Sequence, residues 1–178
     1  YDETLAEYKP SRYFCGPRIL LRELISRQFQ LQAVIAREDF VTNKSMQSLL
    51  LVDRRYGLEY VLGILNSKLI SWFFLAIHSV GRRDDFPKIV LRQTRELPIR
   101  TIDFSDPADV ARHDRLVSLV EAMLALHEQL AAARTPSAKT LLQRQIDATD
   151  REIDALVYDL YDLTPEEIRI VEDETRRA

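Results

Sequence analysis

Residues 58–78 read LEYVLGILNSKLISWFFLAIH, and this stretch decides the fold of the 178-residue chain. Its apolar residues recur at intervals of three and four, the spacing of one face of an α-helix. Further apolar side chains, including Ile70 and Phe74, fall on the remaining sides, so the pattern predicts a helix buried all round. Asn66 and Lys68 fall in the middle of the run, and a charge at the centre of a bilayer is costly. We therefore expect a core helix rather than a membrane span.

The sequence before this helix is typical of β-strands. Three apolar runs have the length of strands, at residues 18–25, 31–36 and 48–53. The polar turn at 42–45 predicts that the last run forms a hairpin with the run before it. After the helix, Ile89-Val90-Leu91 predicts a further strand, and Leu97-Pro98-Ile99 closes the β-containing part, because Pro suits the end of a strand.

The sequence after residue 100 is helical. Asp106-Pro107 predicts a helix start, a break at 135–137 leads into a second helix, and a capping box at 164–167 starts a short final helix. The expected buried stripes are Leu116, Val120, Met123, His127 and Leu130, then Leu142, Ile146, Ile153, Leu156 and Leu160. The expected fold class is α+β: a mixed β-containing core around one buried helix (1–100), then a helical hairpin and a short final helix (101–178).

The net charge of −3 hides a strong asymmetry between the two parts. Residues 1–100 carry 16 Lys and Arg against 11 Asp and Glu, net +5, whereas residues 101–178 are net −8. A basic face can therefore bind a polyanion even though the whole chain is acidic, although long solvated helices also collect acids. The single Cys excludes a disulfide framework, and the first residues show no signal peptide, so we expect a cytoplasmic protein. Because the chain starts at Tyr1, we expect a piece of a longer polypeptide.

No set of residues predicts a catalytic or metal site. His78, His113 and His127 are far apart, and none has metal-ligand spacing with Cys15. The four glycines are isolated, so no phosphate-binding or dinucleotide-binding loop is present. We interpret Gly63 as a position that permits close helix packing. Only binding remains as a predicted role.

Basic and polar residues in loop-like places are the candidates for that role. Arg can reach base edges with a bidentate fork, Lys can hold phosphates, and Asn can pair with adenine. Each of these side chains can equally be a solvated charge or a local ion-pair partner. The predicted DNA-binding residues are Arg37, Asn43, Lys44, Arg82, Arg83, Lys88 and Arg92.

Four phrases occur together in a fixed order along the chain. LGILNSKL at 62–69 is followed by FPKI at 86–89 and LPI at 97–99, and IDALVYDLYDLT at 153–164 comes last. This order resembles the C-terminal target-recognition (specificity) domain of TaqI-like adenine-N6 DNA methyltransferases, including the fused type IIG restriction-modification enzymes.

The resemblance implies a module that reads a duplex DNA sequence and has no catalytic activity of its own. Adenine methylation and S-adenosylmethionine then belong to an upstream part of the parent polypeptide, with which this chain packs. Whether an endonuclease is attached stays open. The matched phrases imply a scaffold, so no individual DNA contact follows from them. We expect no cofactor in this chain and no membrane partner.

Three alternatives stay open from the sequence. The acidic hairpin could make the chain a protein-interaction or dimerisation module without nucleic-acid contact. The chain could be a recognition domain of a type I specificity subunit. Glu7-Tyr8-Lys9 matches the end of a nuclease motif, but Asp2 and Glu3 precede it too closely to supply the usual second carboxylate position.

Overall fold

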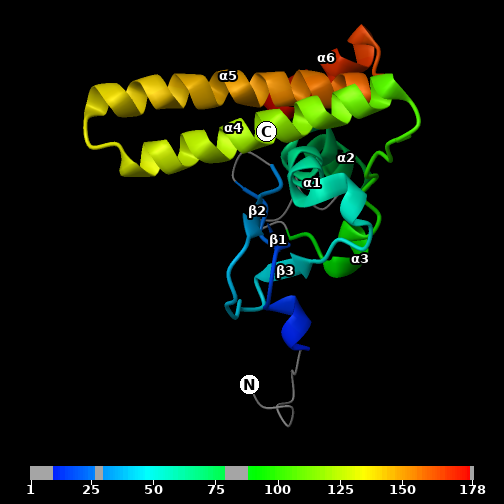
Figure 1. Cartoon of the computed structure of the whole chain (residues 1–178). Coiled ribbons are helices and arrows are strands. Elements are labelled where there is room, and N and C mark those ends of the chain that lie inside the picture. The colour runs from blue at the N-terminus through cyan, green and yellow to red at the C-terminus, as the bar shows by residue number, and fades with distance from the viewer. Residues whose placement is uncertain (1–9, 27–29, 79–87, 177–178) are drawn as a thin grey trace.

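The computed structural model describes residues 10–26, 30–78 and 88–176, and it has the α+β fold that the sequence predicts. Figure 1 shows the α4–α5 hairpin across one end of the molecule, with α1 and α2 beside it and the small sheet beyond them. The elements are η1 (Ser11–Tyr13), β1 (Arg18–Arg22), β2 (Ala33–Ala36), β3 (Met46–Leu49), η2 (Arg54–Tyr56), α1 (Gly57–Asn66), α2 (Lys68–His78), α3 (Leu91–Thr94), α4 (Pro107–Ala132), α5 (Pro136–Leu160) and α6 (Pro165–Arg176).

The three strands form one antiparallel sheet in the order β2-β1-β3. Ile19 in the central strand lies opposite Ile35 on one side and Leu49 on the other. The predicted hairpin between the second and third strands is wrong, because β3 pairs with β1 instead of β2. Through that pairing both edges of β1 are hydrogen-bonded, and Leu49 joins the core cluster that contains Ile19. The strands are also shorter than the apolar runs that predicted them.

The 58–78 stretch forms two helices instead of the single helix that its periodicity predicts. Ser67 has extended backbone angles, and its hydroxyl donates to the carbonyl of Ile64 and accepts from the amide of Ile70. The Asp154 carboxylate accepts from the amide of Lys68, which starts α2. These contacts satisfy the backbone groups that a helix break exposes. The chain can therefore change direction at Ser67 while the apolar residues of both helices stay in the core.

Among the described residues, no single helix has the length and apolar character to span a bilayer. The segments 54–66 and 68–78 have them only as a pair, bent by 60° at Ser67.

The segment 88–94 is not the strand predicted at Ile89-Val90-Leu91. Lys88 forms one isolated bridge with Leu24, and the amide of Ile89 donates to the carbonyl of Glu23. The chain then turns into the short helix α3, because the amide of Val90 donates to the Gln93 side chain. Local capping therefore ends the strand after one pairing.

The predicted helix starts in the second part of the chain are confirmed. The Asp106 side chain accepts from the amide of Ala108, with Pro107 in the first turn of α4. Thr135 caps α5 in the same way, again with a Pro at the first position. At the start of α6, Glu167 accepts from the amide of Thr164, which completes the capping box.

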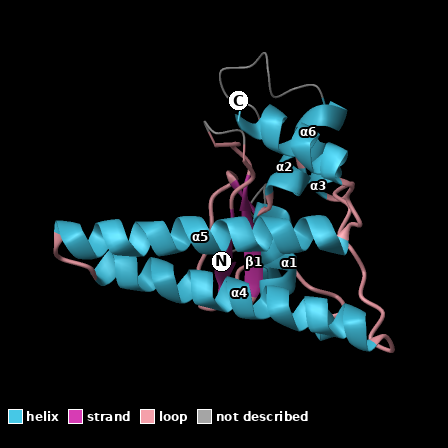
Figure 2. Cartoon of the chain, turned by 90° about the horizontal axis from the view of Figure 1, so that it is seen from above, coloured by secondary structure: helices cyan, strands magenta, loops and turns pink. Residues whose placement is uncertain are grey.

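The predicted buried stripes are confirmed in part: Ile146 and Leu160 are buried, whereas Leu130, Leu142 and Leu156 are only partly buried. Leu116, Val120 and Ile153 are buried, but Met123 is partly exposed and His127 is exposed. Seen from above in Figure 2, the far half of the α4–α5 hairpin projects beyond the sheet and α1. Because each helix there has only the other as a neighbour, one partner cannot cover the whole stripe.

One hydrophobic core joins the two parts of the chain. A continuous cluster of buried residues contains Ile19 and Leu21 of the sheet together with Leu116 and Val157 of the hairpin. Helix α1 lies at its centre, since it contacts β1 and β2 as well as α4 and α5. The division into a DNA target-recognition core (1–100) and a helical tail (101–178) stays a prediction, and the hydrophobic packing is shared by both.

Helices α1 and α4 pack closely where they cross at Gly63, as the sequence predicts. A methyl group on Gly63 would lie 2.9 Å from Cγ2 of Val120 and 3.0 Å from Cδ1 of Leu116. Both side chains are buried, so neither can move aside freely. Glycine at this position therefore sets the distance between the two helices.

We expect Gly63→Val to lower the free energy of unfolding by about 2 kcal/mol, because three extra carbon groups overpack a closed contact. Urea denaturation followed by circular dichroism would measure the change. The same β-branched residue at the exposed position Ala111 of α4 provides a matched control, and Ala111→Val should cost less than about 1 kcal/mol. Equal losses for the two variants would contradict the close crossing.

Candidate nucleic-acid interface

The connection between β2 and β3 is an exposed crossover, residues 37–45. Both strands are antiparallel to β1 and thus parallel to each other, so their connection must return along the length of β1. It leaves the sheet after Ala36, opposite Arg18, and rejoins it at Met46, opposite Arg22. This segment is long enough to present several side chains to a partner.

Three predicted DNA-binding residues lie on the crossover: Arg37, Asn43 and Lys44, all of them exposed. Lys88 and Arg92 lie on the segment 88–95, and both are also exposed. Arg82 and Arg83 lie outside the described residues. The structure thus places five of the seven candidates on two segments.

Hydrogen bonds through Glu23 bring the second half of the crossover beside the 88–95 segment. The amide of Glu23 donates to the carbonyl of Ser45 at 2.9 Å, and its carbonyl accepts from the amide of Ile89 at 2.8 Å. Gln47 adds a bond to the carbonyl of Ile89 and accepts one from Thr94. The two segments therefore form one edge that carries Lys44 and Lys88.

The side chains on these segments differ in which charges and hydrogen-bonding groups remain available to a ligand. Arg37 pairs with Glu59 at 2.5 Å, which neutralises its charge. Asn43 uses its side-chain oxygen to accept from the amide of Ser45, so only its NH₂ group remains available. Arg92 contacts Glu96 at 3.5 Å but is 86% exposed. Lys44 and Lys88 have no ion-pair partner in the part of the chain that the structure describes.

Sequence reasoning missed Arg22, which is exposed at the end of β1. Ile19 and Leu21 belong to the core, so strand alternation places Arg18 and Arg22 on the opposite side of the sheet. Arg22 donates to the side-chain oxygen of Gln32 at 2.9 Å and has no carboxylate partner among the described residues. The alternation within RILLR was the signal that could have identified Arg22 from the sequence. It was missed because residues 18–25 were treated as one apolar run.

The phrase LGILNSKL forms a scaffold that holds the sheet against the helices. Asn66 accepts from the amide of Ala33 at 2.8 Å and donates to its carbonyl at 3.0 Å, as a neighbouring strand would. Lys68 pairs with Asp154 at 3.1 Å and with Glu172 at 3.2 Å, which fastens α2 to α5 and α6. These polar groups are used in contacts within the scaffold.

Two of the other phrases, LPI at 97–99 and IDALVYDLYDLT at 153–164, meet each other. Tyr161 donates its hydroxyl to the carbonyl of Pro98 at 2.5 Å and accepts from the amide of Arg100 at 3.0 Å. Burial raises the pKa of Tyr161 to about 12, so the hydroxyl stays protonated. The LPI segment is thereby fixed to the end of α5.

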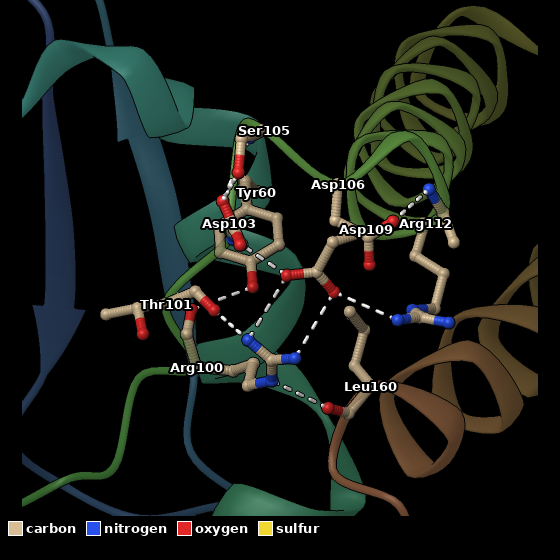
Figure 3. A network of polar contacts seen from close by, with 10 residues as sticks. Tyr60, Arg100, Thr101, Asp103, Ser105, Asp106, Asp109, Arg112 and Leu160 are labelled. Atoms are coloured by element: carbon tan, nitrogen blue, oxygen red, sulfur yellow. Dashed lines mark hydrogen bonds and ion pairs between the residues drawn. The ribbon is translucent and has the colours of Figure 1, made fainter.

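Figure 3 shows the polar network beside this contact, centred on the buried Asp109. Its carboxylate accepts from the amide of Asp103 at 2.8 Å and pairs with Arg100 at 3.2 Å and Arg112 at 3.0 Å. The hydrogen bond from the Asp103 amide, followed by the two guanidinium groups, holds the pKa of Asp109 below its usual value. Tyr60 completes the network by donating to the carbonyl of Arg100.

Within the described ranges, no group of three or more His, Cys, Asp or Glu side chains could hold a metal ion. His113 packs on the ring of Tyr60, and a ring nitrogen lies 3.0 Å from the carbonyl of Tyr56. The exposed cations are suited to binding an anionic partner, while the buried polar networks are used within the fold. The nuclease-like Glu7-Tyr8-Lys9 lies outside the described residues.

The comparison with known families confirms the predicted resemblance. A family model, the TaqI-like C-terminal specificity domain, matches residues 1–99, and the chain belongs to this family. RM.Eco57I of Escherichia coli, a type II restriction enzyme and methyltransferase, is 32% identical over 121 residues, 67% of this chain. A predicted type II restriction enzyme and methyltransferase of Methanocaldococcus jannaschii, RM.MjaORFECS2P, is 27% identical over 158 residues, 86% of this chain. The matched stretch makes up 12% of each relative.

We expect Asp109→Asn to reduce the acid sensitivity of the fold. A carboxylate whose pKa is lowered by folding stabilises the native state at neutral pH, and this contribution is lost as the pH falls through the folded-state pKa. The free energy of unfolding of the native chain, measured in urea, should therefore fall more on acidification than that of Asp109→Asn. Glu121→Gln, an exposed neutralisation on α4, should keep the native pH dependence. An unchanged acid limb in Asp109→Asn would contradict the assignment.

Proposed function

We propose that this chain recognises a specific duplex DNA sequence for a restriction-modification enzyme. Membership of the TaqI-like specificity family supports the proposal, since both relatives are named as restriction enzymes and methyltransferases. The observation that carries it is the edge formed by the crossover and the 88–95 segment, where Lys44 and Lys88 lie exposed without an ion-pair partner among the described residues.

The side chains of this edge divide naturally between the two tasks of DNA recognition. Lys44 and Lys88 present flexible ammonium groups that can neutralise phosphates. Arg22 and Arg92 present guanidinium forks, whose geometry fits the two acceptors of guanine in the major groove. Phosphate contacts then position the duplex, and the forks read its sequence.

The rest of the restriction-modification reaction belongs to other parts of the parent polypeptide in this proposal. An upstream adenine-N6 methyltransferase domain, against which this chain packs, would bind S-adenosylmethionine, and an endonuclease would be attached in the fused enzymes. This chain is non-catalytic and holds no cofactor. The parent works in the cytoplasm, where the cellular DNA is.

The projecting half of the hairpin favours a second role as an interaction module. Leu141 on α5 is 59% exposed. Figure 1 shows that α4 and α5 have only each other as neighbours in the projecting half of the hairpin. As a dimerisation module, the chain would form a concentration-dependent dimer in analytical ultracentrifugation and would show no salt-dependent affinity for DNA.

Upstream methyltransferase motifs in the same polypeptide would exclude a type I specificity subunit.

We expect binding of the 178-residue chain to duplex DNA to weaken with salt, because counterions are released from each neutralised phosphate. Lys44→Gln and Lys88→Gln should each reduce the slope of log K against log salt by about 0.9. Fluorescence anisotropy across a salt series would measure the slopes.

The matched control is Lys139→Gln, which neutralises an exposed lysine on α5 in the projecting half of the hairpin. It should leave the slope unchanged. A native chain with a flat salt response would overturn the proposed function, and equal effects of all three variants would show that only net charge matters.

A further inference from the structure

Arg18 is completely buried, although it is a cation without a carboxylate partner among the described residues. Its Nε has no hydrogen-bond partner. A buried charge is costly, and most buried arginines are paired with acids. A role other than ion pairing with a described carboxylate therefore explains the arginine at this position.

All the hydrogen bonds of Arg18 go to backbone carbonyls around the start of the crossover. Its NH1 group donates to Gly16 at 2.8 Å and to Glu38 at 2.9 Å, and its NH2 group donates to Phe40 at 3.1 Å. The guanidinium also lies 4.8 Å from the centre of the Phe40 ring. One side chain thus determines both the path of the crossover and the position of this ring.

Two further bonds hold the same segment. The amide of Phe40 donates to the carbonyl of Phe14, and the Asp39 carboxylate accepts from the amide of Gly16 at 2.7 Å. The first half of the crossover is therefore tied to the chain that leads into β1. It is preorganised before any partner arrives.

The segment held in this way displays apolar side chains instead of burying them. Phe40 is 44% exposed and Val41 is 66% exposed. The Phe40 ring lies on the side of the sheet away from α1, because it contacts Arg18 on that side, and Val41 follows it in the chain. Val34 on β2 is on the same side and is 53% exposed. A loop that served folding alone would gain by burying the ring fully.

We propose that Phe40 and Val41 form an apolar reading edge that contacts bases of the bound duplex, and that Arg18 is its positioning residue. Apolar side chains read thymine methyl groups or wedge against base steps. This inference rests on the proposed function and adds base-contacting residues to it. Exposed Glu38 lies two residues before Phe40 and disfavours a phosphate at this half, whereas Lys44 attracts the backbone at the other half.

The experiment compares Phe40→Ala and Val41→Ala with the native 178-residue chain on a randomised duplex pool and across a salt series. A lost base contact should reduce enrichment of the preferred sequence at least about fivefold, the lower end of the effect of one mismatched base pair. The salt slope should stay unchanged, because neither residue neutralises a phosphate. Leu141→Ala, an exposed apolar truncation on the projecting hairpin, is the matched control and should alter neither.

Arg18→Lys tests the positioning role, because an ammonium keeps the charge but cannot hold the same set of carbonyls and the ring. It should relax discrimination at the same base positions as Phe40→Ala. Adding Arg18→Lys to the Phe40→Ala/Val41→Ala double variant should cause no further loss of enrichment, because both side chains that Arg18 positions are already removed. Circular dichroism must show a native fold for each variant.

The remaining outcomes distinguish failure of this inference from failure of the proposed function. Native enrichment in Phe40→Ala and Val41→Ala, with the salt slope intact, would overturn this inference and leave the proposed function standing. Salt-dependent binding without any enriched sequence in the native chain would also overturn it. A native chain that shows no salt-dependent DNA binding would overturn both proposals.

Discussion

The close crossing of α1 and α4 at Gly63 is the constraint on which the rest of the structure depends. Helix α1 contacts the sheet as well as α4, so the distance at Gly63 also sets where β1 and β2 lie relative to the hairpin. A larger residue would separate the two helices and open the cluster that joins both parts of the chain. The exposed crossover, which starts and ends at this sheet, takes its position from the same contact.

The phrases that carry the family resemblance act together around this crossing. Asn66 pairs with the free edge of β2, Asp154 starts α2 after the break at Ser67, and Tyr161 holds the LPI segment. All of these groups face other parts of the scaffold. The proposed reading edges, by contrast, lie on segments whose path is fixed at a few backbone contacts, chiefly those of Arg18 and Glu23. This division leaves exposed side chains free to differ without cost to the core.

Several features were predictable because they depend on neighbours in the chain. The caps at Asp106, Thr135 and Thr164 and the helical spacing after them are local patterns. Two failures show the opposite case. Helical spacing continues through Ser67, but Asp154, distant in sequence, supplies a partner for the broken turn. The turn at 42–45 has hairpin composition, yet the third strand gains more by pairing with β1, where Leu49 enters the core.

The sequence by itself determined the α+β class, the helical hairpin, the role of Gly63 and the family of the protein, because periodicity, capping and ordered phrases are written along the chain. Only the tertiary structure decided which basic residues form an edge, which of them are already paired, and that Arg18 is buried beneath Phe40. The physical reason is that ion pairs, burial and strand order depend on contacts between distant segments. A charged residue has the same letter whether it meets solvent, a carboxylate or an aromatic ring.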